Sequence, residues 1–242
     1  MSRGIFITGT DTGVGKTVVT AGLVRWLRQE GIDVVPMKPV QTGAIRQGSR
    51  LIAPDLEFCL AAAGIKPADG EADLMLPYAY EPACSPHLAG RLAHNYPEIS
   101  RIVDCAEKLL QMHRAIVVEG AGGIMVPLNE RQTMLDLMVA MSYPVVLVSR
   151  FSLGTINHTL LSLQALRASG LNLLGVVFNH PEPPQPENQF IEDDNPEAIA
   201  RFGNVLVLGK LRYFENLDPA NSEVWNSFKT NMPEFKRVFD TI

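Results

Sequence analysis

Gly9-Thr10-Asp11-Thr12-Gly13-Val14-Gly15-Lys16-Thr17 is the stretch that decides the fold, because it follows an apolar run and opens a helical pattern. At a strand-to-helix switch of this kind, backbone N–H groups wrap a polyphosphate and the helix N-terminus faces its charge. Gly13 and Gly15 permit the close approach and the positive φ angles that this wrapping needs. Lys16 would reach the β- and γ-phosphates, and the Thr17 hydroxyl would bind Mg²⁺. The sequence therefore predicts a phosphate-binding loop.

The loop departs in one place from the general pattern G-x-x-x-x-G-K-[ST]. Thr10 occupies the first position of that pattern, and the glycine lies one place earlier, at Gly9. Partition ATPases of the ParA/MinD type carry a second lysine in this loop, and the equivalent position here is Asp11. This difference weighs against a partition ATPase.

Short apolar runs alternate with helical patterns along the rest of the chain. We expect strands at 5–8, 34–38, 115–119, 145–149, 174–178 and 205–208, and helices at 16–30, 55–63, 100–112 and 155–169. The strands are nearly all apolar, as in a parallel sheet that is covered on both faces. The alternation predicts an α/β fold, a doubly wound, mostly parallel sheet with helices on both faces, similar to P-loop NTPases, in one domain over 1–242. We interpret 181–196 as a proline-rich surface loop and make no prediction after residue 219.

The composition excludes several classes of protein. The formal charge is −5, so no basic surplus exists to neutralise a nucleic acid or an anionic membrane. Hydrophobic residues make up 46% of the chain, which is enough for a buried core, but no run approaches the ~20 apolar residues of a membrane span. The three widely spaced cysteines suggest neither a disulfide framework nor a zinc site. We expect a cytoplasmic protein that binds small molecules.

Polar residues stand at the ends of the expected strands, where ligands bind on such sheets. Lys38 either projects into the crevice or snorkels at a strand tip, and the sequence alone does not decide between them. Glu119 is placed to reach a Mg²⁺ held by Thr17, and an ordinary turn is the less favoured interpretation. Asp55 follows Pro54 at a helix start, and its residue type alone favours a helix cap.

Two further histidine-containing segments remain open on residue chemistry alone. His87, in Ser85-Pro86-His87, suits a base, a substrate contact or simple packing, with packing favoured. Asn179-His180, at a strand end, suits either a contact to the edge of a nucleotide base or the start of a turn.

Six segments in series resemble the dethiobiotin synthetase family. They are Gly-Thr-Asp-Thr-Gly-Val-Gly-Lys-Thr at 9–17, Lys-Pro-Val-Gln-Thr-Gly at 38–43, Ser-Pro-His at 85–87, Val-Glu-Gly-Ala-Gly-Gly at 118–123, Leu-Gly-Thr-Ile-Asn-His at 153–158 and Gly-Val-Val-Phe-Asn at 175–179. A weaker match, Leu-Gly-Lys-Leu at 208–211, extends the resemblance past residue 210. The Thr-Asp-Thr form of the loop and the segment 153–158 are the most specific of these.

The resemblance implies an ATP-dependent ligase of biotin synthesis that acts on 7,8-diaminopelargonate and CO₂, with Mg²⁺ as cofactor. The amine would add CO₂ to give a carbamate, whose oxygen attacks the γ-phosphate. The second amine would then close the ring and release phosphate. Because two anions must meet, the site needs fixed positive charge.

The resemblance also implies roles for particular residues. Lys16 and Lys38 would be catalytic, and the metal would be bound by Thr17, Asp55 and Glu119. The nucleotide would contact Thr12, Gly13, Val14, Gly15, Lys16, Thr17, Val18, Asp55, Glu119, Gly120, Ala121, Gly122, Asn179, His180, Leu211, Arg212 and Tyr213. The substrate would contact Thr42, and in a homodimer its acid tail would reach the partner's helix start at Gly154, Thr155, Ile156 and Asn157.

Two other functions compete with this one. A partition or scaffold ATPase would use hydrolysis to switch partners, and Asp11 and the acidic charge weigh against it. An amidotransferring cobyrinate synthase shares the expected fold but carries an extra glutamine-hydrolysing domain. About thirty residues after Leu211 are too few for such a domain.

Overall fold

The computed structural model describes residues 3–48 and 50–236. Within them, a six-stranded sheet has the order β10-β9-β8-β1-β7-β2, and all neighbouring strands run parallel. Its strands are β1 (Gly4–Gly9), β2 (Val34–Met37), β7 (Ala115–Gly123), β8 (Val145–Ser149), β9 (Leu173–Asn179) and β10 (Val207–Leu211). Because β1 is central, the loop that follows it opens in the middle of the sheet's carboxyl edge, where α/β proteins bind ligands.

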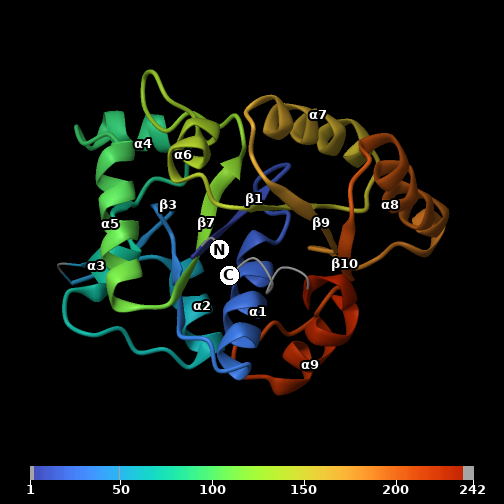
Figure 1. Ribbon diagram of the computed structural model, residues 1–242, viewed down its shortest axis with the longest axis horizontal. Coiled ribbons are helices and arrows are strands. Elements are labelled where there is room, and N and C mark those ends of the chain that lie inside the picture. Colours follow the sequence, from blue (N-terminus) through green and yellow to red (C-terminus); the bar gives the residue numbers. More distant parts are fainter. Residues whose placement is uncertain (1–2, 49, 237–242) are drawn as a thin grey trace.

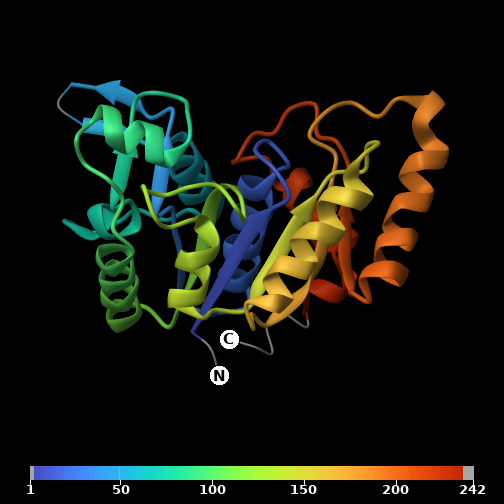
Figure 2. The same ribbon diagram turned by 90° about the horizontal axis from the view of Figure 1, so that it is seen from above.

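Helices cover both faces of this sheet (Figures 1 and 2), which confirms the predicted fold class. They are α1 (Lys16–Gln29), α2 (Pro54–Ala63), α3 (Glu71–Met75), α4 (Pro86–Leu92), α5 (Ile99–Met112), α6 (Met134–Met141), α7 (Thr155–Ala168), α8 (Gln189–Gly203) and α9 (Ser222–Asn231). Across residues 3–48 and 50–236, none of these helices has the length and apolar character needed to span a membrane.

Short elements complete the described chain. Two small pairs of strands join β3 (Val40–Thr42) to β6 (Tyr78–Tyr80) and β4 (Ile45–Gln47) to β5 (Arg50–Ile52). Two 3₁₀ turns are η1 (Pro186–Asn188) and η2 (Pro233–Phe235). The β3–β6 pair matters for the site, because β3 begins two residues after Lys38.

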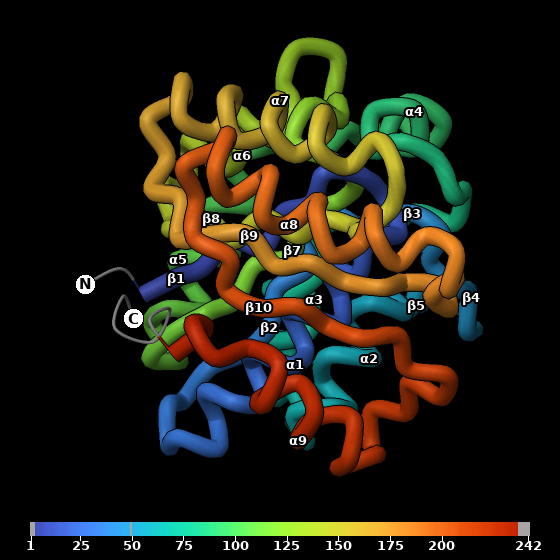
Figure 3. The backbone as a smooth tube through the Cα atoms, turned by 90° about the vertical axis from the view of Figure 1, so that its right-hand side faces the viewer, coloured from blue at the N-terminus to red at the C-terminus, as the bar shows by residue number. Residues whose placement is uncertain are grey.

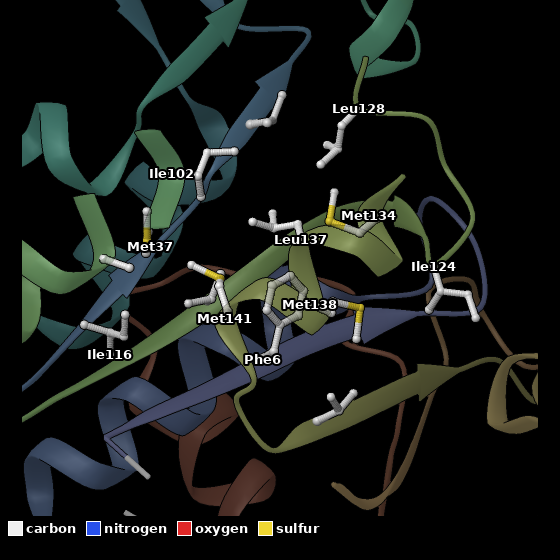
Figure 4. Packing of buried hydrophobic residues seen from close by; sticks show 14 of the residues in the cluster. Phe6, Met37, Ile102, Ile116, Ile124, Leu128, Met134, Leu137, Met138 and Met141 are labelled. Atoms are coloured by element: carbon white, nitrogen blue, oxygen red, sulfur yellow. The ribbon is translucent and has the colours of Figure 1, made fainter. Parts of the chain in front are cut away.

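Alternate residues of each central strand enter two separate apolar clusters. Phe6 belongs to a cluster with residues of α5, α6, α7 and α8, whereas Ile5 and Ile7 belong to a cluster with residues of α1 and α9. In Figure 4, Phe6 of β1 lies among Met134, Leu137, Met138 and Met141 of α6. Both faces of the sheet are therefore buried, which explains why its strands are apolar at every position.

The C-terminal helix α9 lies beside α1 (Figures 1 and 3) and covers the helix that carries the phosphate-binding loop. Trp225 and Phe228 of α9 are buried in the α1 cluster, and so is Phe235 of η2. At Gly22 of α1, an added Cβ atom would lie 2.4 Å from the Phe228 ring. The glycine therefore permits the close packing of the two helices.

Two sequence predictions between residues 181 and 211 are wrong, one of a loop and one of the bounds of a strand. Only 181–185 of the expected loop 181–196 is irregular; η1 follows, and then α8, which contains Pro196 inside the helix. Burial of Ala198 and Ile199, together with a hydrogen bond from Asn195 Nδ2 to the Phe151 carbonyl (2.6 Å), outweighs the helix-breaking tendency of the proline. The strand expected at 205–208 is β10, which runs from Val207 to Leu211 and includes Gly209.

Candidate active site

The loop between β1 and α1 has the conformation that a phosphate-binding loop requires. Gly13 and Gly15 have φ angles of +72° and +100°, in the region that side chains other than glycine rarely adopt. Gly15 is the N-cap of α1, and a Cβ atom there would lie 2.1 Å from Asn179 Nδ2. Asn179 in turn donates to the Val14 carbonyl (3.0 Å), so the end of β9 is fixed against the loop.

Lys16 lies across the same loop. Its buried Nζ donates to the Asp11 carbonyl at 2.8 Å, inside the turn that the loop makes. Burial, and then the nearby ammonium group of Lys38, lower the pKa of Lys16 to about 8. Two cationic side chains are thus held close together at one edge of the sheet.

Beside this loop, three distant parts of the chain bring charged side chains together: the segment after β2, helix α2 and strand β7. Lys38 Nζ lies 2.7 Å from Glu119 Oε1 and 2.7 Å from Asp55 Oδ2. The Thr17 hydroxyl donates to Glu119 Oε1 as well, at 2.8 Å. Burial alone would lower the pKa of Lys38, but Glu119 and Asp55 outweigh it and raise that pKa above its ordinary value. Lys38 is therefore a fixed cation at the strand end, not a snorkelling side chain.

Asp55 does not cap its helix, contrary to what its residue type favoured. The N-cap of α2 is Ala53, no side chain caps this helix, and Asp55 is the second helical residue. Its carboxylate, with about a third of the side chain exposed, reaches back to Lys38 instead. The local sequence could not show this, because the contact depends on how α2 packs beside β2.

A cavity of about 690 Å³ joins the loop to the charge cluster. Eleven of the predicted residues line it, namely Thr12, Gly13, Gly15, Lys16, Thr17, Lys38, Thr42, Asp55, Glu119, Ala121 and Gly122. Seven further residues line the cavity without a predicted role, namely Val40, Gln41, Ala83, Cys84, Ser85, Pro86 and Val126. Within the described residues, Val14, Val18 and Gly120 lie outside this lining, and Val14 is fully buried in the core.

His87 is occupied by a local contact. Its Nδ1 lies 3.0 Å from the Ser85 hydroxyl, and its backbone N–H donates to the Pro127 carbonyl. In the described structure His87 does not line the cavity, whereas Ser85 does. This arrangement supports the packing interpretation of the histidine.

A second group of predicted residues gathers at the ends of β9 and β10. The His180 N–H donates to the Leu211 carbonyl at 3.2 Å, which holds the segment of Arg212 and Tyr213 next to Asn179. The His180 ring stacks on Phe151 at 4.2 Å and pairs with Glu192 at 3.2 Å. Burial lowers the pKa of His180, against the opposing charge of Glu192.

The third predicted group, at the start of α7, does not join the cavity. Gly154 is the N-cap of α7, with φ +91°, and Thr155 donates from its hydroxyl to the Arg150 carbonyl at 2.7 Å. Within the described residues, none of Gly154, Thr155, Ile156 and Asn157 lines the cavity that contains Lys38 and Thr42. The neighbouring Leu153 side chain is 85% exposed.

Arg150 contacts the phosphate-binding loop, although its sequence context predicts no role for it. It directly follows β8, and its Nη2 donates to the Thr12 carbonyl at 2.7 Å. No motif marks this arginine, but its place after an apolar strand is the same signal that singled out Lys38 and Glu119.

The oxygen atoms of the cluster fit a magnesium ion that shares its ligands with a nucleotide. Mg²⁺ takes one or two carboxylates and completes its shell with phosphate oxygens and water. Asp55, Glu119 and the Thr17 hydroxyl offer such a set beside the loop. Residues 3–48 and 50–236 contain no group of three or more His, Cys, Asp or Glu side chains that could hold a metal without a nucleotide.

A family model and three relatives show which proteins this chain resembles. The model of the AAA-domain family matches residues 3–221. The ATP-dependent dethiobiotin synthetase of Halalkalibacterium halodurans is 40% identical over 87% of this chain and 85% of its own length. The enzymes of the same name from Anaeromyxobacter sp. strain Fw109-5 and Thermodesulfovibrio yellowstonii are 41% and 37% identical, over 89% and 90% of this chain and 92% of each relative.

Solved structures show the same fold at much lower identity. The cell-division ATPase MinD of Pyrococcus furiosus superposes with a TM-score of 0.62 at 17% identity, over 98% of this chain and all of that one. MinD of Aquifex aeolicus gives a TM-score of 0.54 at 17% identity, over 99% of this chain and 95% of that one. At this identity the likeness concerns the fold of P-loop NTPases and carries no function with it.

Proposed function

The chain belongs to the family of ATP-dependent dethiobiotin synthetases, and on this premise we propose that it carboxylates 7,8-diaminopelargonate and closes the ring to dethiobiotin. One amine takes up CO₂ as a carbamate and releases a proton, and the carbamate oxygen attacks the γ-phosphorus of ATP and displaces ADP. The second amine attacks the carbon of the resulting anhydride and expels phosphate. The observation that carries the proposal is the buried Lys38–Glu119 ion pair, joined by the partly exposed Asp55, beside the phosphate-binding loop.

The two lysines supply what this reaction needs most. A carbamate and a triphosphate repel each other, so the site has to provide fixed cations where their oxygens meet. Lys38 is held by two carboxylates and keeps its charge, and Lys16 lies across the loop within the same cavity. We propose that both contact the transferring phosphoryl group and that Lys38 also orients the carbamate.

The same cavity offers residues for the nucleotide and the metal. The backbone of Thr12–Val18 would hold the phosphates, and the strand end Glu119–Gly122 would flank them. Thr17, Asp55 and Glu119 would bind Mg²⁺, which would withdraw negative charge from the phosphoryl group. Thr42, on β3, lines the cavity near Lys38 and is placed for the amine or carbamate.

We further propose that the nucleotide base lies toward the ends of β9 and β10. Asn179 is fixed to the phosphate-binding loop through Val14, so its amide lies close to the loop's helix start. His180 bonds to Leu211 and brings Arg212 and Tyr213 to the same side. Those five residues would flank the base and select it.

The position of the α7 start supports a homodimer with shared sites. Gly154–Asn157 would bind the carboxylate tail of the substrate through backbone N–H groups. They lie outside the lining of the cavity of their own chain, so the tail that they bind would belong to a substrate held by a second copy. We propose such a dimer, in the cytoplasm, built from one domain over 1–242; the unpaired Cys59, Cys84 and Cys105 agree with a reducing compartment.

Incorporation of labelled bicarbonate tests this function directly. Label should enter an acid-stable product only when the diamine and Mg·ATP are both present, with one ADP formed per ring. Reactions without the diamine, or with ADP in place of ATP, are the controls. Rapid ATP hydrolysis that is independent of the diamine would refute the proposal and would favour a partition-type ATPase.

A further inference from the structure

Arg150 connects the end of β8 to the phosphate-binding loop. Its Nη2 donates to the Thr12 carbonyl at 2.7 Å and lies 3.7 Å from Asp11 Oδ2. The hydrogen bond and the ion pair of this guanidinium, as the described structure has them, therefore both go to the first half of the loop. Residue 150 is far from the loop in sequence, and the contact exists only because β8 pairs with β1.

The turn that Arg150 contacts is the exposed part of the loop. Asp11 accepts a hydrogen bond from its neighbour, the Thr12 N–H (2.7 Å), while Thr12 and Gly13 are exposed. Gly13 has a left-handed backbone, and a Cβ atom built there would lie 3.8 Å from Arg150 Nη2. The guanidinium thus covers the loop at the residue that has no side chain of its own.

Arg150 is itself held firmly. Its carbonyl accepts a hydrogen bond from the Thr155 hydroxyl at 2.7 Å. Thr155 belongs to a buried hydroxyl cluster with Ser149 and Thr159, in which Ser149 Oγ lies 2.7 Å from each threonine hydroxyl. The base of the arginine is therefore fixed by the first turn of α7.

One N–H group of the Arg150 guanidinium makes no hydrogen bond in this position. Arg150 Nε is buried and has no partner in the described structure. A buried donor without a partner is costly, so its placement calls for an explanation outside its own hydrogen bonding. A contact that keeps a ligand loop in shape provides one.

We propose that Arg150 is a positioning residue that holds the Asp11–Gly13 turn in the conformation that receives the phosphates of the nucleotide. The inference rests on the proposed nucleotide site. An exposed, glycine-containing turn loses conformational entropy when a ligand orders it, and a loop that is already ordered binds with less loss. Because Arg150 contacts the loop and does not line the cavity of Lys38 and Thr42, its removal should weaken nucleotide binding more than the chemical step.

Three variants and one binding assay test this inference. Calorimetric titration with Mg·ADP, without the diamine, should show a Kd for Arg150→Ala that is about tenfold higher than for the unchanged protein, or ~1.4 kcal/mol. The KM for ATP should rise in parallel, while kcat at saturating ATP, the KM for the diamine and the melting temperature change little. Arg150→Lys should recover part of the affinity, because an ammonium can still donate to the Thr12 carbonyl. Arg131→Ala removes an exposed arginine of equal charge and should leave the Kd unchanged.

The outcomes separate this inference from the proposed function. An unchanged Kd for Mg·ADP in Arg150→Ala overturns the inference, even if the protein makes dethiobiotin. A fall in kcat without a change in nucleotide affinity would also overturn the inference. An equal loss of Mg·ADP affinity in Arg131→Ala would overturn it as well, because it would indicate a general effect of charge. If the protein binds Mg·ADP in an Arg150-dependent way but forms no ring, the proposed function is wrong and the positioning role stands.

Discussion

Replacing Lys38 by methionine should destabilise the protein strongly in the absence of magnesium. The Lys38 side chain is 6% exposed and that of Glu119 is 3% exposed, with Nζ and Oε1 2.7 Å apart. Removal of one partner of a buried ion pair costs ~3–5 kcal/mol, because the other charge stays buried. Asp55 is a third exposed and recovers much of its solvation from water, so we expect a loss near the lower end, about 3 kcal/mol. Urea unfolding in EDTA measures it.

A double variant shows whether the buried charge is the cause. Lys38→Met with Glu119→Gln removes both charges and leaves an amide that still accepts the hydrogen bond from Thr17. It should be more stable than Lys38→Met alone, although it carries one more substitution. The reasoning is refuted if Lys38→Met unfolds at the same urea concentration as the unchanged protein, or if the second substitution restores nothing. In both variants kcat should fall by about 10²–10³ or more, as when a preorganised charge is removed from a transition state.

Three further predictions concern the loop and the thiols. Gly15→Ala places a methyl group against Asn179 and forces alanine into a left-handed backbone, which costs ~1–2 kcal/mol. Calorimetric titration should show that the affinity for Mg·ADP falls by tenfold or more. An affinity equal to that of the unchanged protein would contradict the geometry. The pKa of Lys16 is lowered to about 8 and phosphates favour its charged form, so nucleotide binding should take up a fraction of a proton near pH 8 and weaken at higher pH. Calorimetry in buffers of different ionisation heat detects this uptake, and Lys16→Arg, which stays charged, should abolish it. Burial raises the pKa of Cys59 well above its ordinary value, so iodoacetamide at pH 8 should label the half-buried Cys84 first, and equal labelling rates by mass spectrometry would contradict this.

The sequence predicts the sheet well where each strand is a continuous apolar run between turn residues. The run 145–149 matches β8 at both ends, and 5–8 differs from β1 by one residue at each end. The prediction misplaces β10 because Gly209 and Lys210 interrupt its apolar pattern, whereas the end of α9 and Met232 pack against Gly209 and leave no space for a side chain there. The sequence does not predict helix α8, because its proline and acidic residues favour a loop locally. The burial of Ala198 and Ile199 outweighs this local preference in the folded protein.

The candidate site was predictable in its parts and not in its contacts. Parallel strands end at one edge, so Lys38 and Glu119 could be expected to converge on the loop from their strand positions alone. The contact of Asp55 with Lys38 could not be expected in this way, because it depends on the packing of α2. Arg150 carries no motif at all, and its role follows from the pairing of β8 with β1.

Helix α9 has a consequence for how this protein can be shortened. The match to the AAA-domain family ends at residue 221, so a fragment cut there would retain every group assigned to the reaction. It would also expose the apolar surface of α1 against which Trp225 and Phe228 pack. Such a fragment should aggregate on expression, and its inactivity would say nothing about its catalytic groups.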